Sequence, residues 1–525
     1  MGASRREQMV AIALLLLLSL LEATRAAHVL MVFPVGSPSH WNLGRAMAKG
    51  LHAQGHRITA VTPFPGQGPP NNWTDVALPN TMSFFGHTAG LFDLGTASDF
   101  AVLLKLQKFG TYSCETFLQH ENVKKLFSSN EKYDVMIIEI FFCECFLALS
   151  HIFKIPVIQF ATFSPPAWMG DVVGNPSPPA YVPEPFLEYS DHMTFFQRLH
   201  NTVFSAYCRV VRNLYYMPSQ DAIVRRYVHD PTLPSLLEIE RKSSMVLANS
   251  HFSVLHPRPL LPAMVEVGGM HVSPPKKLPE DLQKFLDGAK DGAVVFSLGS
   301  NLRSADLGED KRTAILTAFS KLKQRVIWKW ETETLPGKPD NLMVKKWLPQ
   351  ADILAHKNLK VFITHGGLLS TFEAVYHGVP VVGVPVFGDQ ELNMIRAEEK
   401  GYALRLQFSN LTAESFFWAI TEVLHNPSYR MKAQQLSRLF HDRPRTPLQE
   451  VVYWTEYVVR HKGAPHMRSA ALELCWYQRL LLDVLAAALA AAAAVLWVLK
   501  VALRTVHRLI VGRGPDSPKK KLKKK

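Results

Sequence analysis

The stretch Trp347–Gln390 constrains the fold of this chain more than any other. Within it, an apolar β-branched run over 361–364 ends at His365, Gly366 and Gly367, and apolar residues at helical spacing follow at once. This order predicts a strand, a glycine turn and a helix. Glycines let the backbone approach a ligand closely, and the first amides of a helix offer free N–H groups and a positive dipole end. The stretch therefore predicts a site for an anion such as a diphosphate.

Aromatic and polar side chains flank this turn at positions that suit a nucleotide sugar. Trp347 and Gln350 precede it on a predicted loop, Glu373 lies inside the helix, and Asp389 and Gln390 follow the next strand at the same edge of the sheet. A flat aromatic ring can stack on a base, carboxylates can bind sugar hydroxyls, and amides can bind phosphates. An isolated His-Gly-Gly can be a mere tight connection, but these neighbours favour a nucleotide-sugar site.

Strand and helix patterns alternate on both sides of a break that begins with the sequence PPKKLP. Before the break, the patterns predict strands over 29–33, 58–61 and 133–140. After it, they predict strands over 294–298 and 326–330 and a helix over 313–322. Alternation on both sides of a linker implies an α/β protein with two doubly wound parallel sheets that face each other across a cleft. The stretch 163–217 is rich in Pro and aromatics with little periodicity, which is typical of an elaborated binding pocket.

Each part of the chain has a predicted role in this organisation. We predict a signal peptide over 1–27, an N-terminal domain over 28–273, a linker over 274–284, a C-terminal domain over 285–460, a segment returning to the membrane over 461–479, a transmembrane helix over 480–503 and a basic cytosolic tail over 504–525. The many alanines of the predicted span leave a soluble helix as the alternative.

The net charge of +14 is concentrated at the C-terminus. The segment from Lys500 onward carries +9 of it, so the rest of the chain is only mildly basic. A nucleic-acid partner is therefore not indicated.

The five cysteines show neither metal-ligand spacing nor a disulfide framework. They are Cys114, Cys143, Cys145, Cys208 and Cys475. Cys143 and Cys145 are predicted to lie on the same strand. We interpret the cysteines as structural, with at most one disulfide.

The stretch 347–390 resembles the signature of the UDP-glycosyltransferases, the family that includes the UDP-glucuronosyltransferases, and HGGLLS over 365–370 resembles its invertebrate members. The similarity covers nearly the whole chain. It implies the GT-B fold, with two Rossmann-like domains and one C-terminal transmembrane helix. It also implies transfer of a hexosyl group from a UDP-sugar to the hydroxyl of a small lipophilic acceptor, as in detoxification. No Asp-x-Asp pair stands where a metal-dependent transferase would need one, so neither a metal nor another cofactor is expected.

Two residues are candidates for the chemistry of transfer. His40 follows the first strand at the start of a helix, and its SHW sequence matches the catalytic histidine of the family. Such a histidine is a more effective general base when a carboxylate orients its ring and stabilises the imidazolium that forms. The family has an aspartate for this role, and Glu139 stands at that position here. The extra methylene keeps the charge but lets the carboxylate reach further. Asp134 is the alternative partner, and a buried Glu139 that merely ends the strand is the structural alternative.

On the donor side the resemblance implies one role for each residue. It assigns uracil stacking to Trp347, ribose binding to Gln350 and Glu373, diphosphate binding to Ser300, His365, Gly366 and Gly367, and sugar binding to Asp389 and Gln390. In-line attack by the activated hydroxyl would invert the anomeric carbon.

Two departures from the vertebrate members bear on the choice of sugar. Ala248 stands where they have an arginine, and Leu369 stands where they have an asparagine in the glycine turn. Loss of a guanidinium removes the best partner for a carboxylate, so UDP-glucose is favoured and UDP-glucuronate is the alternative. Arg396 or another basic side chain could still reach the cleft.

The termini predict a location in the endoplasmic reticulum. The signal peptide, the apolar span and the Lys/Arg-rich tail predict a single-pass type I membrane protein with its catalytic body in the lumen. The terminal lysines are similar to dilysine retrieval signals of that membrane, although they could also hold anionic lipid. Asn72 and Asn410 begin glycosylation sequences that a lumenal body could use.

Two other classes of protein remain open at this point. One is a GT-B enzyme of different outcome, such as a UDP-sugar epimerase or hydrolase. The other is a membrane-tethered protein that binds lipophiles without turning them over. A homo-oligomer is also left open.

Overall fold

The computed structural model describes residues 26–85 and 92–512. All but the last two residues of the predicted signal peptide, and the tail beyond residue 512, lie outside the described residues. The chain divides into two units, Met1–Arg468 and Ser469–Lys525, and each is described by itself.

The first sheet of the larger unit has seven strands, all parallel, in the order β3-β2-β1-β4-β5-β6-β7. The strands are β1 His28–Val32, β2 Arg57–Thr62, β3 Trp73–Ala77, β4 Val135–Glu139, β5 Val157–Ala161, β6 Met245–Ala248 and β7 Met264–Glu266. The helices of this part are α2 Pro38–Ala53, α4 Asp99–Gln119, α5 Glu121–Phe127, α6 Ala148–Phe153, α7 Ala167–Asp171, α8 Phe195–Val211, α9 Met217–Tyr227 and α10 Leu236–Glu240. The direction of strand succession reverses between β1 and β4, and such a switch point is where open α/β sheets bind ligands.

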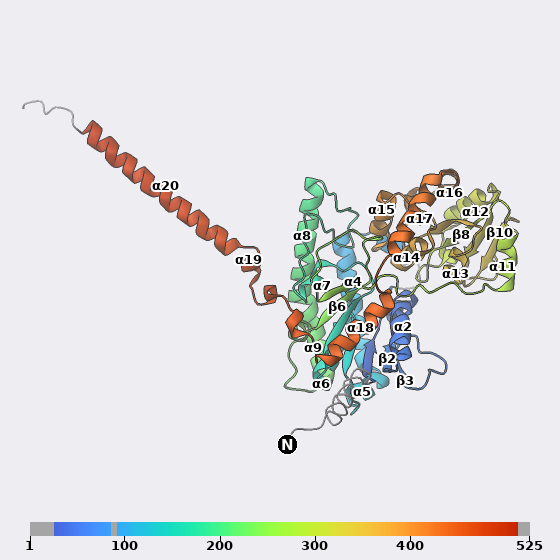
Figure 1. Ribbon diagram of the computed structural model, residues 1–525, viewed down its shortest axis with the longest axis horizontal. Coiled ribbons are helices and arrows are strands. Elements are labelled where there is room, and N and C mark those ends of the chain that lie inside the picture. The colour runs from blue at the N-terminus through green and yellow to red at the C-terminus, as the bar shows by residue number, and fades with distance from the viewer. Residues whose placement is uncertain (1–25, 86–91, 513–525) are drawn as a thin grey trace, which may run out of the picture. The chain divides into compact units, whose positions relative to one another are not determined.

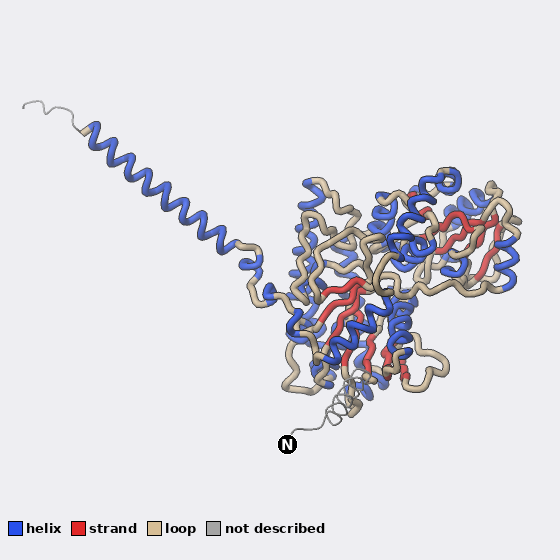
Figure 2. The backbone as a smooth tube through the Cα atoms, viewed as in Figure 1, coloured by secondary structure: helices blue, strands red, loops and turns tan. Residues whose placement is uncertain are grey.

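The second sheet has six parallel strands in the order β10-β9-β8-β11-β12-β13. The strands are β8 Ala293–Ser297, β9 Arg325–Lys329, β10 Leu342–Lys345, β11 Leu359–Thr364, β12 Val381–Gly383 and β13 Ala403–Arg405. The helices are α11 Glu280–Asp287, α12 Glu309–Ser320, α13 Gln350–Leu354, α14 Leu368–His377, α15 Gln390–Glu399, α16 Ala413–His425 and α17 Pro427–His441. Its switch point lies between β8 and β11. Two doubly wound sheets were predicted, and Figures 1 and 2 show both with helices around them.

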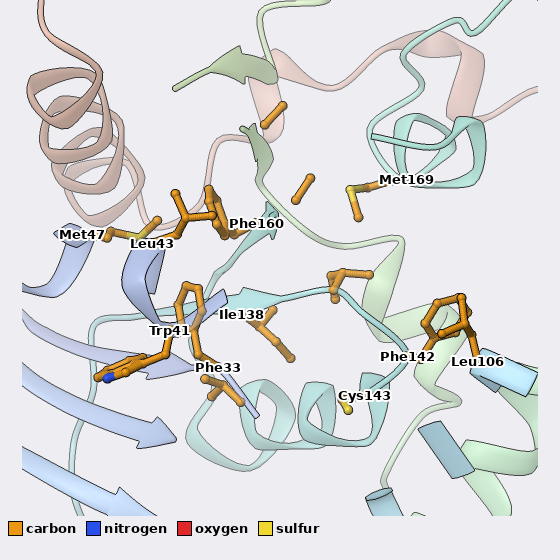
Figure 3. Packing of buried hydrophobic residues seen from close by; sticks show 14 of the residues in the cluster. Phe33, Trp41, Leu43, Met47, Leu106, Ile138, Phe142, Cys143, Phe160 and Met169 are labelled. Carbon is orange, nitrogen blue, oxygen red and sulfur yellow. The ribbon is translucent and has the colours of Figure 1, made fainter. Parts of the chain in front are cut away.

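The strands read as apolar runs because helices cover both faces of each sheet. Every residue of β1 and β4 is buried. In the core of the first sheet the ring centroids of Phe33 and Trp41 lie 6.1 Å apart and those of Phe33 and Phe160 lie 5.8 Å apart. Figure 3 labels these three side chains among the buried cluster. These contacts lock the start of α2 against the end of β1, which fixes the backbone that carries His40.

Three local expectations were wrong. Gln350 begins the short helix α13 and does not lie on a loop. The stretch 163–217 contains the regular helix α8, whose N-terminus has a capping box of Thr194 and Gln197. Cys145 lies in a 3-10 turn over Glu144–Leu147, so Cys143 and Cys145 do not share a strand. The capping box of Thr194 and Gln197 starts α8 where apolar periodicity is weak, whereas α13 and the 3-10 turn begin without a side-chain cap.

The last helix of the larger unit, α18 Pro447–Arg460, packs on α2 of the first sheet. A Cβ at Gly50 of α2 would lie 2.5 Å from the side chain of Leu448. The segment 285–460, predicted as one domain, therefore includes a helix that covers the other sheet. A return crossing of this kind ties the two sheets together at a second point besides the linker.

One disulfide joins Cys114 of α4 to Cys145, which agrees with the expectation of at most one. Cross-linking a loop of 31 residues restricts the unfolded chain. Replacing both residues with serine is expected to lower the free energy of unfolding by about 2–4 kcal/mol. Urea unfolding of the purified chain measures this, and a double replacement of the free, buried Cys143 and Cys208 is the comparison. Equal stability of the wild type and the Cys114/Cys145 variant would show that the two thiols are unpaired.

The smaller unit contains α19 Trp476–Arg479 and α20 Leu482–Val511. Among the described residues, α20 is the one helix long and apolar enough to cross a membrane. It extends eight residues beyond the predicted end at residue 503, because Leu, Arg and Val continue the helix after the apolar run stops. A 30-residue helix is about 45 Å long, which exceeds the roughly 30 Å hydrocarbon core of a bilayer. Its last basic turns would therefore extend into the headgroup region.

Candidate active site

His40 and Glu139 meet at the switch point of the first sheet. His40 lies in the first turn of α2, directly after β1, and Glu139 is the last residue of the neighbouring strand β4. His40 Nδ1 pairs with Glu139 Oε1, and Thr162 Oγ1 lies 3.3 Å from the same nitrogen. The Glu139 side chain is fully buried, whereas that of His40 is 17% exposed. An ionised carboxylate only accepts hydrogen bonds, so Nδ1 carries the proton and Nε2 keeps a free lone pair.

Asp134 lies at the opposite end of β4. Its Oδ2 accepts a hydrogen bond of 2.8 Å from the backbone N–H of His28. The five residues of the strand separate it from the switch point by about 16 Å. Asp134 is therefore out of reach of His40, and the alternative assignment to Asp134 is wrong.

The turn after β11 has the backbone geometry that its glycines suggested. Gly366 has φ +82°, and a Cβ there would lie 2.6 Å from Met394 Cγ and 3.0 Å from the Gln390 carbonyl oxygen. Gly367 is the N-cap of α14, so the first free amides of that helix follow it. A side chain at Gly366 would clash, which explains why the position is glycine.

The His365 ring lies between two close stretches of backbone. A Cβ at Gly367 would meet its Nε2 at 2.5 Å, and a Cβ at Gly299 would meet its Cε1 at 2.5 Å. Burial lowers the pKa of His365 to about 4, and the positive charge of Lys329 lowers it further. The ring is therefore neutral at pH 7 and can donate one N–H hydrogen bond.

The polar residues predicted for the ribose lie together. Gln350 Nε2 donates to Glu373 Oε2 at 2.5 Å and to Ser370 Oγ at 3.0 Å. Burial raises the pKa of Glu373 to about 7, which the Gln350 hydrogen bond opposes. Trp347 lies nearby on the cleft wall with 65% of its surface exposed, so its ring face is available for stacking.

Asp389 and Gln390 stand at the N-terminus of α15. Gln390 Oε1 accepts hydrogen bonds from the backbone N–H groups of Val386 and Phe387, at 2.9 and 3.2 Å, which leaves its amide hydrogens free to donate. Asp389 accepts one from Asn393 at 3.0 Å. Burial raises the pKa of Asp389, while the Asn393 hydrogen bond and the nearby His40 oppose the shift.

All these side chains surround one cleft of about 420 Å³ between residues of the two sheets. Its lining includes His40 from the first sheet and Ser300, Trp347, Gln350, His365, Gly367, Glu373, Asp389 and Gln390 from the second. Gly366 and Glu139 lie behind it. The structure thus brings the predicted catalytic and donor residues to one place.

Most of the apolar wall of the cleft comes from residues between 82 and 109, where the sequence had indicated no pocket. Its members are Met82, Phe85, Leu94, Val102, Leu106, Phe109 and Phe141. The stretch 163–217, predicted to form this wall, contributes only Phe163 to it. Buried Lys329, at the end of β9, also lines the cleft, and a lysine inside an apolar strand is a signal that could have identified it.

Two residues considered for sugar choice lie away from the cleft. Ala248 is fully buried at the end of β6, and its methyl group does not line the cleft. Arg396 is buried in α15, 4% exposed, and does not line it either. Leu369 does line the cleft.

Other predicted or potential sites lie outside the cleft. Asn72 and Asn410 are both exposed, as a glycosylation acceptor must be. Among the described residues, Asp191, His256 and Glu399 could together hold a metal ion, but none of the three lines the cleft.

Two facing Rossmann-like sheets with one polar cleft define the GT-B class of glycosyltransferases. The solved structure of the calicheamicin glycosyltransferase CalG4 has the same fold, with a TM-score of 0.56 at 17% identity, over 83% of this chain and 99% of that one. A family profile described as "UDP-glucoronosyl and UDP-glucosyl transferase" matches residues 88–515, and the chain belongs to this family. It is 38% identical to "UDP-glycosyltransferase UGT5" of Dactylopius coccus, over 97% of this chain and 98% of that one. It is 36% identical to "UDP-glucosyltransferase 2" of the same insect, over 89% and 90%. The chain is therefore a UDP-glycosyltransferase, as the resemblance implied.

Proposed function

We propose that the protein transfers a neutral hexosyl group, preferably glucose, from UDP to the hydroxyl of a small lipophilic acceptor with inversion at the anomeric carbon. The observation that carries the proposal is that the His40–Glu139 pair and the N-terminus of α14 open on the same cleft. A base and an anion site at one place are what a sugar transfer requires.

In this mechanism His40 Nε2 takes the proton of the acceptor hydroxyl as the oxygen attacks the anomeric carbon. Glu139 holds the other ring nitrogen and stabilises the imidazolium that forms. The leaving diphosphate receives hydrogen bonds from His365, Ser300 and the first amides of α14, whose dipole favours its charge. We propose that this arrangement needs no metal ion. Attack opposite the leaving group inverts the carbon.

The apolar wall supports a lipophilic acceptor. The side chains of Phe85, Leu106, Phe109 and Phe141 line the cleft on the side of the first sheet, which also carries His40. Burial of apolar surface there stabilises an uncharged ring or chain and disfavours an ionic acceptor. We infer that phenols and similar hydroxyl compounds bind at this wall.

UDP-glucose is expected to give a higher kcat/KM than UDP-glucuronate with one phenolic acceptor. The described lining contains no arginine, and the Asp389 carboxylate stands where the resemblance puts the sugar. The Asp389 carboxylate would repel the carboxylate of a glucuronosyl group, and the described lining has no arginine to pair with it. The two lining lysines, Lys276 and Lys329, are nearer to the predicted nucleotide site: Lys329 Nζ lies 6.0 Å from the Trp347 ring centroid, and Lys276 N–H donates to Asp352. A ratio that favours glucuronate would overturn this choice of donor.

The assay that tests the proposed function measures UDP release from the full chain, with and without a phenolic acceptor. A transferase releases UDP at a substantial rate only when the acceptor is present. Release that needs no acceptor would indicate a hydrolase, and conversion of the sugar without release would indicate an epimerase. Saturable acceptor binding without any turnover would indicate a binding protein.

We further propose that α20 anchors the protein in the endoplasmic reticulum membrane with the body in the lumen. The support is the length of α20 and the lysines and arginines that follow its apolar part. Protease added to sealed microsomes is then expected to remove only a few kilodaltons from the C-terminus. Detergent-opened microsomes serve as the control, and digestion of the body in sealed ones would reverse the orientation.

A further inference from the structure

Helix α8 and the turn after it carry a continuous apolar stripe on their outward face. We define the α8 stripe as Phe196, Leu199, Val203, Val210, Leu214 and Tyr215, whose exposed fractions lie between 50% and 77%. Their spacing of three, four or seven residues places most of them on one side of the helix. The opposite side, with Phe204 and Cys208, is buried in the core. Exposed apolar patches of this extent mark surfaces that contact another protein or a membrane.

The charge around the stripe suits a lipid surface. The segment 195–216 contains no Asp or Glu. Of its three arginines, Arg209 is bonded to Asp171 and Arg212 is buried against Glu240, which leaves Arg198 exposed. A helix whose own residues include an exposed arginine and no carboxylate fits the headgroup region of a bilayer, where anionic lipids attract cations.

The chain itself limits how far this surface can be from a membrane. The larger unit ends at Arg468, whose guanidinium donates to the carbonyl of Arg241 at 2.5 Å, directly after α10. Helix α10 packs on α9, and α9 continues the helix of the stripe through a π-helical turn. Only 13 residues, 469–481, join this exit point to α20, and they span at most about 45 Å when fully extended. Exposed Trp476 lies within that tether and suits the interface.

The stripe also lies beside the apolar part of the cleft. Phe100 of α4 contacts Phe204 and Tyr207 of α8, with ring centroids 5.2 and 4.8 Å apart. Two and six residues further along α4, Val102 and Leu106 line the cleft. One helix layer therefore separates the stripe from the acceptor wall.

We propose that the α8 stripe docks on the bilayer in which α20 is anchored, and that lipophilic acceptors dissolved in the bilayer enter the cleft from this side. The proposal rests on the anchoring by α20 stated above. It assigns to α8 a role in substrate access that the transfer chemistry itself does not require.

Docking is tested with the full chain in nanodiscs that hold one chain each. In a Cys475→Ser background, where the remaining free cysteines Cys143 and Cys208 are buried, Leu199→Cys or Met431→Cys receives an environment-sensitive fluorophore. Met431 is 60% exposed on α17 and is the matched control. Nitroxide-bearing lipids are expected to quench the label at position 199 and to leave the label at 431 bright. Equal quenching at both positions, or none at 199, overturns the proposal.

A label at Leu489→Cys in α20 separates the failure of docking from that of anchoring. Quenching at 489 without quenching at 199 shows an anchored chain whose stripe does not touch lipid, which contradicts docking alone. If the stripe instead binds a second copy, unlabelled Leu199→Cys chains form a disulfide-linked dimer in detergent when an oxidant is added. Lipid quenching of the labelled variant in single-chain discs is then absent, and this too overturns the proposal.

Access is tested by comparing Leu199→Glu/Val203→Glu with the control Met431→Glu/Leu439→Glu. The first variant is expected to raise the KM for a long-chain alkylphenol several-fold while the KM for phenol and the affinity for UDP are unchanged. Intact UDP affinity shows that the variant is folded. An unchanged KM for the alkylphenol overturns the access role. A wild-type chain that turns over no acceptor would instead refute the proposed transferase function, and the quenching result alone would then decide docking.

Discussion

His40→Ala is expected to slow sugar transfer by about 10²- to 10⁴-fold while UDP affinity stays nearly unchanged. His40 lines the cleft from the first sheet, and its Nε2 is the free nitrogen of a ring whose Nδ1 is held by Glu139. The predicted nucleotide residues belong to the second sheet, so the loss of the imidazole leaves them in place. Steady-state kinetics with a phenol, together with calorimetric titration of UDP, measures both quantities.

His52→Ala is the matched control for this variant. His52 lies in the last turn of the same helix α2, and its Nε2 lies 2.8 Å from the carbonyl oxygen of Asn71, away from the cleft. Its loss is expected to leave the rate of transfer unchanged. Wild-type turnover by His40→Ala would show that another group is the base, and an equal loss in both variants would point to damage to α2.

Glu139→Gln is expected to lower kcat by about 10²-fold or more, because the amide keeps the size of the side chain but not its charge. Glu139 is fully buried, and its Oε2 has no hydrogen-bond partner among the described residues, so its charge acts chiefly on His40. A neutral partner still accepts the Nδ1–H hydrogen bond but stabilises the imidazolium less. Rapid-quench measurement of a single turnover isolates this step from product release.

Asp134→Asn separates this effect from damage to strand β4. The variant weakens the hydrogen bond to the His28 backbone at the other end of the strand, so it is expected to cost stability and leave kcat unchanged. If Glu139→Gln turned over at the wild-type rate, the carboxylate would be a structural residue at the strand end. A fall in kcat for Asp134→Asn would argue for long-range distortion of the sheet.

The sequence by itself determined the alternation of strands and helices, the two sheets and the glycine turn at His365. These features depend on interactions between residues a few positions apart: buried parallel strands require continuous apolar runs, and the positive φ of Gly366 requires glycine. Topology then places residues that follow parallel strands at one edge of the sheet, because the carboxyl ends of these strands meet there. The pairing of His40 with Glu139, 99 residues apart, was instead implied by the resemblance to the family, and topology explains why the two meet.

Only the tertiary structure decided which distant segments form the apolar wall, which cysteines pair and which side chains reach the cleft. Phe85 and Phe109 come from outside the stretch that composition suggested, Cys114 pairs with Cys145, and Ala248 is buried away from the donor. The sequence likewise does not show whether the apolar residues of the α8 stripe are buried or exposed. A contact between remote segments depends on how whole helices pack on the sheets, and no local pattern of residues encodes that choice.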